Sequence, residues 1–303
     1  MAEAFAPAGE PVVLSAANGA LVVRATAGRW TGIAPALTPV SISFQNGLEL
    51  AGYGTTQMQP AGPVEVVLYW RPAQPLRDDA HVFVQILDRS GTAVAAAHVW
   101  PFNGVYRLGA WQPGQLLPMT FRFNLPQELA PGPYRLIAGL VDLTSQGQVP
   151  TAAGDSFATV AVLKIPRPPS TFVPAHSTAA AFGESIRLSG YTVEQAAGGT
   201  RITFQWQALS QMAADYTLFI HVVDPAGAIV AQADSQPFDG AYPTSLWSPG
   251  ETLAEARTLT IPPGRYRIDV GFYLLNTGER LPVTVKGERQ PEDQLALTDL
   301  QVP

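Results

Sequence analysis

Pro237-Phe-Asp-Gly240-Ala-Tyr242-Pro-Thr-Ser-Leu-Trp247-Ser-Pro-Gly250 is the stretch of sequence that decides the fold. An earlier stretch, Pro101-Phe-Asn-Gly104-Val-Tyr106-Arg-Leu-Gly-Ala-Trp111-Gln-Pro-Gly114, has the same proline, glycine, tyrosine and tryptophan positions 136 residues upstream. So many matches in one register indicate an internal repeat, which constrains a fold more than any local pattern does. The chain is therefore expected to contain two copies of one structural unit.

The repeat extends along most of the chain. Each copy spans about 120 to 140 residues, a length that buries a hydrophobic core without disulfides or metals. After a short deletion in the second copy, the spacing between matching residues falls from 136 to 132. Further matching pairs are Trp70 and Trp206, Phe83 and Phe219, Asp88 and Asp224, Tyr134 and Tyr266, and Gly139 and Gly271.

The repeat also sets the domain boundaries. The first domain is predicted to cover residues 1–165 and the second, its duplicate, residues 182–303. Residues 166–181 are rich in proline and are predicted to form a stiff linker. Residues 1–40 have no counterpart in the second copy and are predicted to add an N-terminal hairpin, with strands near 12–14 and 21–24.

Apolar residues alternate with polar ones inside each copy. Ile268, Val270 and Phe272 alternate with residues of a second face, and the stretches that end at Trp70 and Trp206 do the same. This period of two is typical of half-buried strands. Tyr134 and Tyr266 each follow a Pro-Gly corner, as a tyrosine corner does. The sequence thus predicts an all-β protein of two tandem immunoglobulin-like or fibronectin-like antiparallel β-sandwiches.

Composition excludes several classes of protein. The chain has 303 residues, no cysteine and a net charge of −6, and only 14% of its residues are charged. Disulfides and thiolate metal sites are therefore excluded, and nucleic-acid binding, which needs clustered cations, is not expected. No apolar run reaches the roughly 18 residues of a membrane span. Residues 1–7 show no signal peptide, so the chain reads as cytoplasmic or as a piece of a longer protein.

No catalytic motif is found, and we expect neither an enzyme nor a bound cofactor or metal. The chain lacks HExxH, GxSxG, GxxxxGK and GxGxxG, and no two histidines have metal-ligand spacing. His81, His98 and His176 are expected to be surface histidines without a role. Asp224 offers one carboxylate in its loop, so turn capping is favoured over a calcium site. Paired acids for sugar hydrolysis are disfavoured because the first copy replaces Asp234 with His98.

A polar group on one sheet face of the second copy is the candidate ligand-binding site. His221 lies on a predicted strand whose second face also carries Phe219, and Gln232 and Asp234 lie on the next strand. Tyr273 and Arg280 complete the candidate set. The favoured alternative makes His221 a partly buried side chain that is hydrogen-bonded to a neighbouring strand.

The aromatic residues allow two interpretations. Trp111 and Trp247 recur at one place in both copies, which favours a role in the core, although aromatic faces would also suit stacking against sugars. Trp100 has no counterpart in the second copy and stays open as a stacking residue. Tyr106 and Tyr242 belong to the same aromatic group.

Residues 182–303 resemble the soluble β-sandwich region that follows the membrane helices in bacterial glycosyltransferases of the dolichyl-phosphate-mannose-protein mannosyltransferase type. The resemblance is carried by 186–191, 216–224, 231–234, 237–240, 242–244, 247–251, 262–266 and 278–282. It implies an extracytoplasmic accessory domain at the cell surface, without the membrane part that holds that family's catalytic acids. The first copy departs from the pattern, which would make it a spacer.

These observations lead to one functional hypothesis and two alternatives. The hypothesis is a non-catalytic, extracytoplasmic binding or positioning module of a cell-envelope glycosylation or surface protein, which contacts a glycan or a protein partner. The first alternative is a structural stalk, filament or assembly subunit built from immunoglobulin-like modules. The second is an enzyme that acts on sugars, which the missing motifs disfavour.

Overall fold

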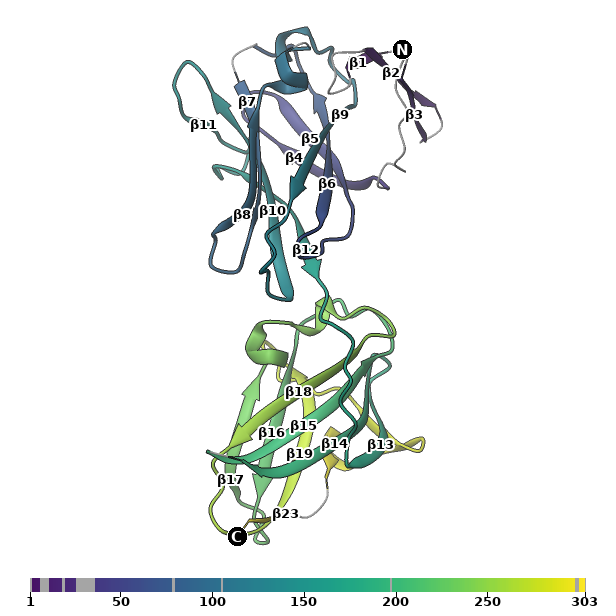
Figure 1. The fold of residues 1–303 in the computed structure, drawn as a ribbon, viewed down its shortest axis with the longest axis vertical. Coiled ribbons are helices and arrows are strands. Elements are labelled where there is room, and N and C mark those ends of the chain that lie inside the picture. The colour runs from purple at the N-terminus through teal and green to yellow at the C-terminus, as the bar shows by residue number, and fades with distance from the viewer. Residues whose placement is uncertain are drawn as a thin grey trace. The chain divides into compact units, whose positions relative to one another are not determined.

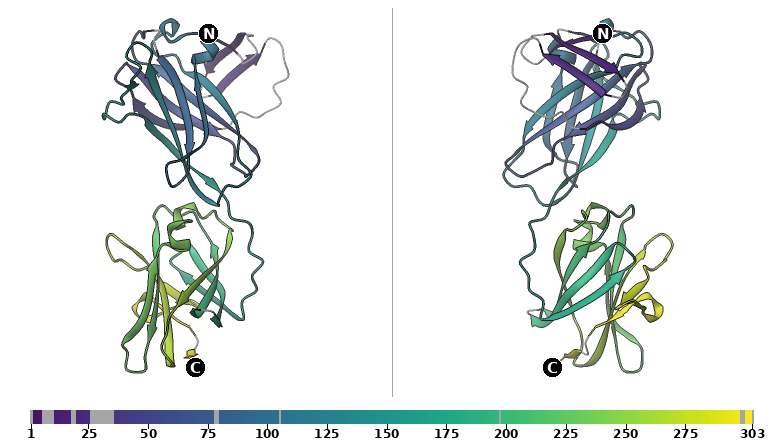
Figure 2. Two further views of the ribbon diagram at one scale, coloured as in Figure 1. Left: turned by 60° about the vertical axis from the view of Figure 1, so that its left-hand side comes forward. Right: turned by 90° about the vertical axis from the view of Figure 1, so that its right-hand side faces the viewer.

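The computed structural model describes residues 2–5, 11–17, 20–25, 36–77, 80–104, 106–196, 198–297 and 300–302, and those before residue 36 by their backbone alone. The chain divides into two compact units, Met1–Ile165 and Pro166–Pro303. The described residues form β-strands joined by loops and short 3₁₀ turns, with no α-helix (Figure 1; further views in Figure 2). The predicted all-β sandwich fold is confirmed. No helix in this part of the chain is long and apolar enough to cross a membrane.

From residue 38 onward, the described residues of the first unit form two antiparallel sheets. One has the order β4-β5-β6-β9, and the other has the order β11-β10-β7-β8, with β12 also paired to β10. The first sheet consists of β4 (Thr38–Ser43), β5 (Leu48–Thr55), β6 (Pro63–Pro72) and β9 (Leu117–Asn124). The second consists of β7 (Ala80–Leu87), β8 (Ala93–Val99), β10 (Gly132–Asp142), β11 (Gln148–Val149) and β12 (Ala158–Ile165).

The second unit repeats this arrangement. Its larger sheet has the order β18-β15-β14-β13-β20-β21, and the other has the order β17-β16-β19-β22, with β23 also paired to β19. The larger sheet consists of β13 (His176–Phe182), β14 (Ile186–Ala196), β15 (Gly199–Ala208), β18 (Thr252–Leu259), β20 (Val283–Val285) and β21 (Glu288–Arg289). The other consists of β16 (Tyr216–Val223), β17 (Ile229–Ser235), β19 (Gly264–Leu274), β22 (Leu295–Ala296) and β23 (Leu300–Val302).

The core of each unit lies between its two sheets. Trp70 on β6 and Trp206 on β15 are both fully buried, as are Ile268, Val270 and Phe272 on β19. The predicted inward faces of these strands are therefore confirmed. In each unit the buried residues of the two sheets pack into one hydrophobic cluster between them.

The predicted linker at 166–181 is too long. Residues 176–182 form β13, which pairs with β14 and contributes the fully buried Ala180 and Phe182 to the core. Small residues and a histidine hide this strand in the sequence, because they give no run of β-branched side chains. The preceding segment lies against the second unit, where the Gln205 amide donates to the Phe172 carbonyl at 3.1 Å.

The N-terminal segment forms a small antiparallel sheet of its own. It consists of β1 (Ala2–Phe5), β2 (Pro11–Ala17) and β3 (Ala20–Ala25), in that order. The pairing of β2 with β3 includes the predicted strands at 12–14 and 21–24. The other parts of this predicted segment lie outside the described residues, namely residue 1 and residues 6–10, 18–19 and 26–35.

The repeated stretch forms the same pair of tight turns in both units. These are η1 (Pro101–Gly104) with η2 (Leu108–Ala110), and η3 (Pro237–Gly240) with η4 (Thr244–Leu246). Trp111 and Trp247 follow these turns, are 1% and 0% exposed, and each donate from Nε1 to the backbone oxygen of the tyrosine five residues earlier at 3.1 Å. Both tryptophans are therefore core residues and cannot stack on a sugar.

Candidate functional site

The outer face of the smaller sheet in the second unit carries the predicted site residues. Phe219 and His221 point away from the core on β16, because their neighbours Leu218, Ile220 and Val222 fill it. Register places Asp234 opposite Phe219 and Gln232 opposite His221 on β17. Directly paired residues of an antiparallel sheet share one face, so this register brings four side chains together.

His221 and Asp234 form the centre of this face. His221 Nε2 lies 3.5 Å from Asp234 Oδ1, and the two side chains are 16% and 27% exposed. The His221 ring lies 4.8 Å from the Phe219 ring. His221 is thus partly buried and in contact with a neighbouring strand. This agrees with the alternative interpretation of His221 that the sequence favours.

Tyr273 and Arg280 border the same face. The Tyr273 ring lies 6.3 Å from the Phe219 ring, and the pKa of its hydroxyl is raised by burial and, to a smaller extent, by Asp234. The guanidinium carbon of Arg280 lies 4.6 Å from the centre of the Phe219 ring, and its Nη1 donates to the backbone oxygen of Glu292 at 2.8 Å. Glu292 belongs to the short turn η5 (Pro291–Asp293).

The structure therefore places all five predicted residues on one face, which we call the polar face. It consists of His221, Gln232, Asp234, Tyr273 and Arg280. They come from β17, β16, β19 and the loop after β19. Sequence reasoning could bring them together because residues at alternate positions of neighbouring strands must share a face.

An ion pair beside the polar face was missed. Arg267 and Asp269 on β19 form two hydrogen bonds of 2.8 Å, and Gln294 donates to Asp269 Oδ2 at 3.1 Å. Asp269 is only 2% exposed because β22 pairs with it. The sequence signal was present, since opposite charges two residues apart on a strand point to the same side.

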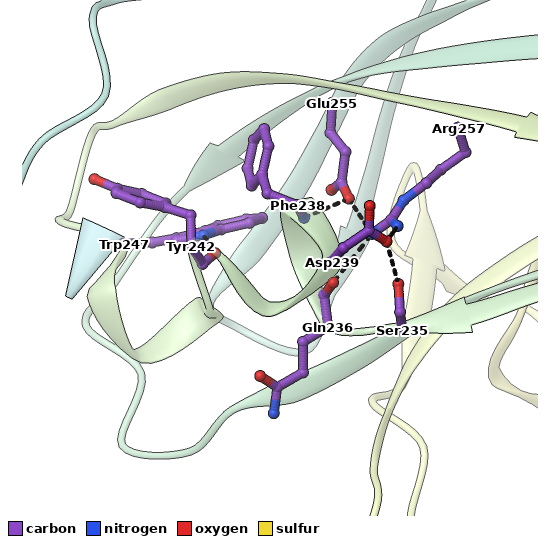
Figure 3. A network of polar contacts seen from close by, with 8 residues as sticks. All are labelled: Ser235, Gln236, Phe238, Asp239, Tyr242, Trp247, Glu255 and Arg257. Atoms are coloured by element: carbon purple, nitrogen blue, oxygen red, sulfur yellow. Dashed lines mark hydrogen bonds and ion pairs between the residues drawn. The ribbon is translucent and has the colours of Figure 1, made fainter. Parts of the chain in front are cut away.

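A second polar cluster lies on the inward face of β18 (Figure 3). Glu255 is 1% exposed and accepts a hydrogen bond of 2.8 Å from the Phe238 backbone nitrogen. Arg257 pairs with both Glu255 and Asp239 and donates to the Gln236 backbone oxygen at 3.0 Å. Burial raises the pKa of the Glu255 carboxyl, and the charge of Arg257 opposes this rise. The cluster stabilises turn η3 and was not predicted.

Asp224 and His81 have structural roles. Asp224 Oδ1 accepts backbone hydrogen bonds of 2.9 Å from Ala226 and Ala228, so turn capping, the favoured interpretation, is confirmed. Among the described residues no three acidic or histidine side chains are placed to hold a metal ion. His81 packs edge-on against Trp100 at 4.1 Å, and it is not a free surface histidine.

Comparisons with known proteins give little. No family model matches the chain, and no curated protein matches it significantly. Among solved structures, a calcium-binding mutant of Bacteroides uniformis beta-glucuronidase 2 is 13% identical, with a TM-score of 0.24 over 72% of this chain and 26% of that one. Ruminococcus gnavus beta-glucuronidase in complex with uronic isofagomine is 10% identical, with a TM-score of 0.17 over 78% and 35%. At these TM-scores the matches say nothing about what this chain does.

Proposed function

We propose that this chain is a non-catalytic, extracytoplasmic binding or positioning module that contacts a glycan through the polar face of its second unit. The observation that carries the proposal is the convergence of His221, Asp234, Tyr273 and Arg280 from separate segments on one face. A few convergent polar groups beside aromatic rings are typical of small-molecule sites. Hydroxyl groups of a sugar suit such a mixture of hydrogen-bond donors and acceptors.

The carboxylates on this face have basic neighbours. Asp234 lies beside His221, and Asp269 is held by Arg267. The extracytoplasmic location rests on the resemblance of residues 182–303 to the soluble region of membrane glycosyltransferases.

Titration calorimetry of the full chain with a panel of oligosaccharides tests the proposal. Asp234→Ala and Tyr273→Ala are expected to weaken binding at least tenfold, because a hydrogen bond to a charged group contributes about 1.5–3 kcal/mol. Arg201→Ala is the matched control, since Arg201 is exposed on β15 in the other sheet of the same unit. Binding weaker than millimolar to every glycan, or equal binding by all variants, would refute the proposal.

A structural role is the second candidate, and an exposed sheet edge favours it. β17 lies at the end of its sheet, and Ile229 and Val230 on it are 50% and 38% exposed. Open edges with apolar side chains pair with strands of other chains. Sedimentation at rising protein concentration would then show an oligomer, and Ile229→Lys would abolish it. A monomer at all concentrations excludes this candidate.

A further inference from the structure

The first unit has an open pocket at the place that corresponds to the polar face. The pocket lies on the outer face of β7, β8 and β10 and has a volume of about 660 Å³, within the range of ligand sites. Its floor is a separate apolar cluster of Phe83, Leu87 and Ile137, against which Val141 and Phe157 pack. We call it the first-unit pocket.

The duplication explains why this pocket is open. In both units a phenylalanine ring lies on a glycine of the neighbouring strand, since an added Cβ would come 2.4 Å from the ring at Gly139 and at Gly271. In the second unit the guanidinium group of Arg280 lies over that ring. Gln148 occupies the matching position in the first unit, opposite Val141, and its shorter side chain leaves the space free.

The charge of the pocket also differs from that of the polar face. Arg135 matches Arg267, but Ile137 stands where Asp269 holds that arginine. No ion pair or hydrogen bond joins the Arg135 side chain to any described residue, and none of the described residues that line the pocket is acidic. A free guanidinium fork at the rim of an apolar floor suits a carboxylate.

The other polar lining residues offer hydrogen bonds. The side-chain amides of Gln85 and Gln148 line the pocket and have no hydrogen-bond partner among the described residues, and His98 lies beside them. Amides both donate and accept, as sugar hydroxyls require. We propose that the first-unit pocket binds an acidic sugar, whose carboxylate pairs with Arg135 while its C–H face lies on the floor around Phe83.

Matched ligands test this assignment on the full chain. Methyl glucuronide and methyl glucoside differ only in the carboxylate, and benzoate offers a carboxylate without hydroxyls. We expect the glucuronide to bind at least tenfold more tightly than either of the others in titration calorimetry, and added salt to weaken it. Equal binding of the glucoside would overturn the role of Arg135, and tighter binding of benzoate would overturn the sugar class.

Variants locate the ligand. Arg135→Gln is expected to weaken glucuronide binding at least tenfold, whereas Arg267→Gln, the same change at the matching position of the second unit, is expected to leave it unchanged. Arg135 is exposed, so its replacement leaves the core intact, and an unchanged unfolding temperature checks this. Loss of affinity in Arg267→Gln alone would place the ligand on the second unit and refute the assignment. The pocket does not depend on the polar face, so variants of Asp234 leave this binding unchanged.

Discussion

The two copies differ at one buried pair of positions, which is charged in the second unit and apolar in the first. This difference allows a quantitative test of whether the two kinds of pair can replace one another. Glu255 and Arg257 occupy inward positions of β18, where the matching strand β9 carries Met119 and Phe121. Both pairs fill the same side of a sandwich, one by charge and one by apolar contact. Replacing both charged residues with their counterparts should therefore restore packing that this fold already uses.

The expected free energies follow from burial. Glu255→Met removes the acceptor of the Phe238 backbone nitrogen and one of the two carboxylate partners of Arg257, and Arg257→Phe leaves a carboxylate that is 1% exposed without its cation. Each single change is expected to destabilise the second unit by about 3 kcal/mol, the lower end for a broken buried pair. The double variant is expected to lie within about 1 kcal/mol of the wild type, because apolar replacement of whole pairs is near neutral.

The assay is thermal unfolding of the full chain by calorimetry. A loss of 3 kcal/mol lowers the midpoint of a unit this size by about 10 °C, and the first-unit transition serves as an internal reference. The double-mutant cycle then gives a coupling free energy of about 5–7 kcal/mol between the two side chains. If the losses are additive, the double variant will be about 6 kcal/mol less stable than the wild type. That result would refute the expectation that the apolar pair can replace the ion pair.

Three further changes test other contacts. Burial and nearby His98 lower the pKa of His81 in the folded state. Below pH 6.5 the unfolded chain therefore binds more protons than the folded chain, and the first unit loses stability as the pH decreases. His81→Phe should reduce the loss of first-unit stability between pH 7 and 5 in urea titrations. Gly271→Ala should destabilise by about 1–3 kcal/mol, because the new Cβ meets the Phe219 ring, and an unchanged midpoint would contradict this. Tyr242→Phe removes a hydroxyl that donates to a carboxylate at 2.6 Å, and urea unfolding should show a loss of about 1.5–3 kcal/mol.

Much of the fold could be predicted because half-buried strands show an alternation of apolar and polar residues in the sequence. The faces of β6, β15 and β19 follow from period two, and the repeat transfers each assignment to the other copy. β13 and β22 could not be predicted, because their residues gain strand geometry only by pairing with β14 and β19. Strands without β-branched or aromatic runs carry almost no local signal.

The candidate site was predictable for the same reason, and its surroundings were not. The polar face follows from residues at alternate positions of adjacent strands. The burial of Asp269 and Glu255 was missed because charged residues are mostly exposed in proteins. From the sequence alone they are therefore assigned to the surface unless their partners are known. The first-unit pocket could not be predicted from the sequence. It is open because the side chain of Gln148 is shorter than that of Arg280, which covers the matching place in the second unit.

The turns η1 and η3 have a consequence for the order of folding. Phe102 and Asn103, like Phe238 and Asp239, have φ between 47° and 55°, a left-handed backbone that is unfavourable by about 1–2 kcal/mol per residue. Asn103 and Asp239 adopt this conformation more readily than most residues, but Phe102 and Phe238 do not. The turn is therefore expected to form only after distant strands have docked beneath it. Substitutions at Phe238 should then accelerate unfolding and hardly slow folding. The most recognisable stretch of this sequence is expected to be among the last parts of each unit to fold.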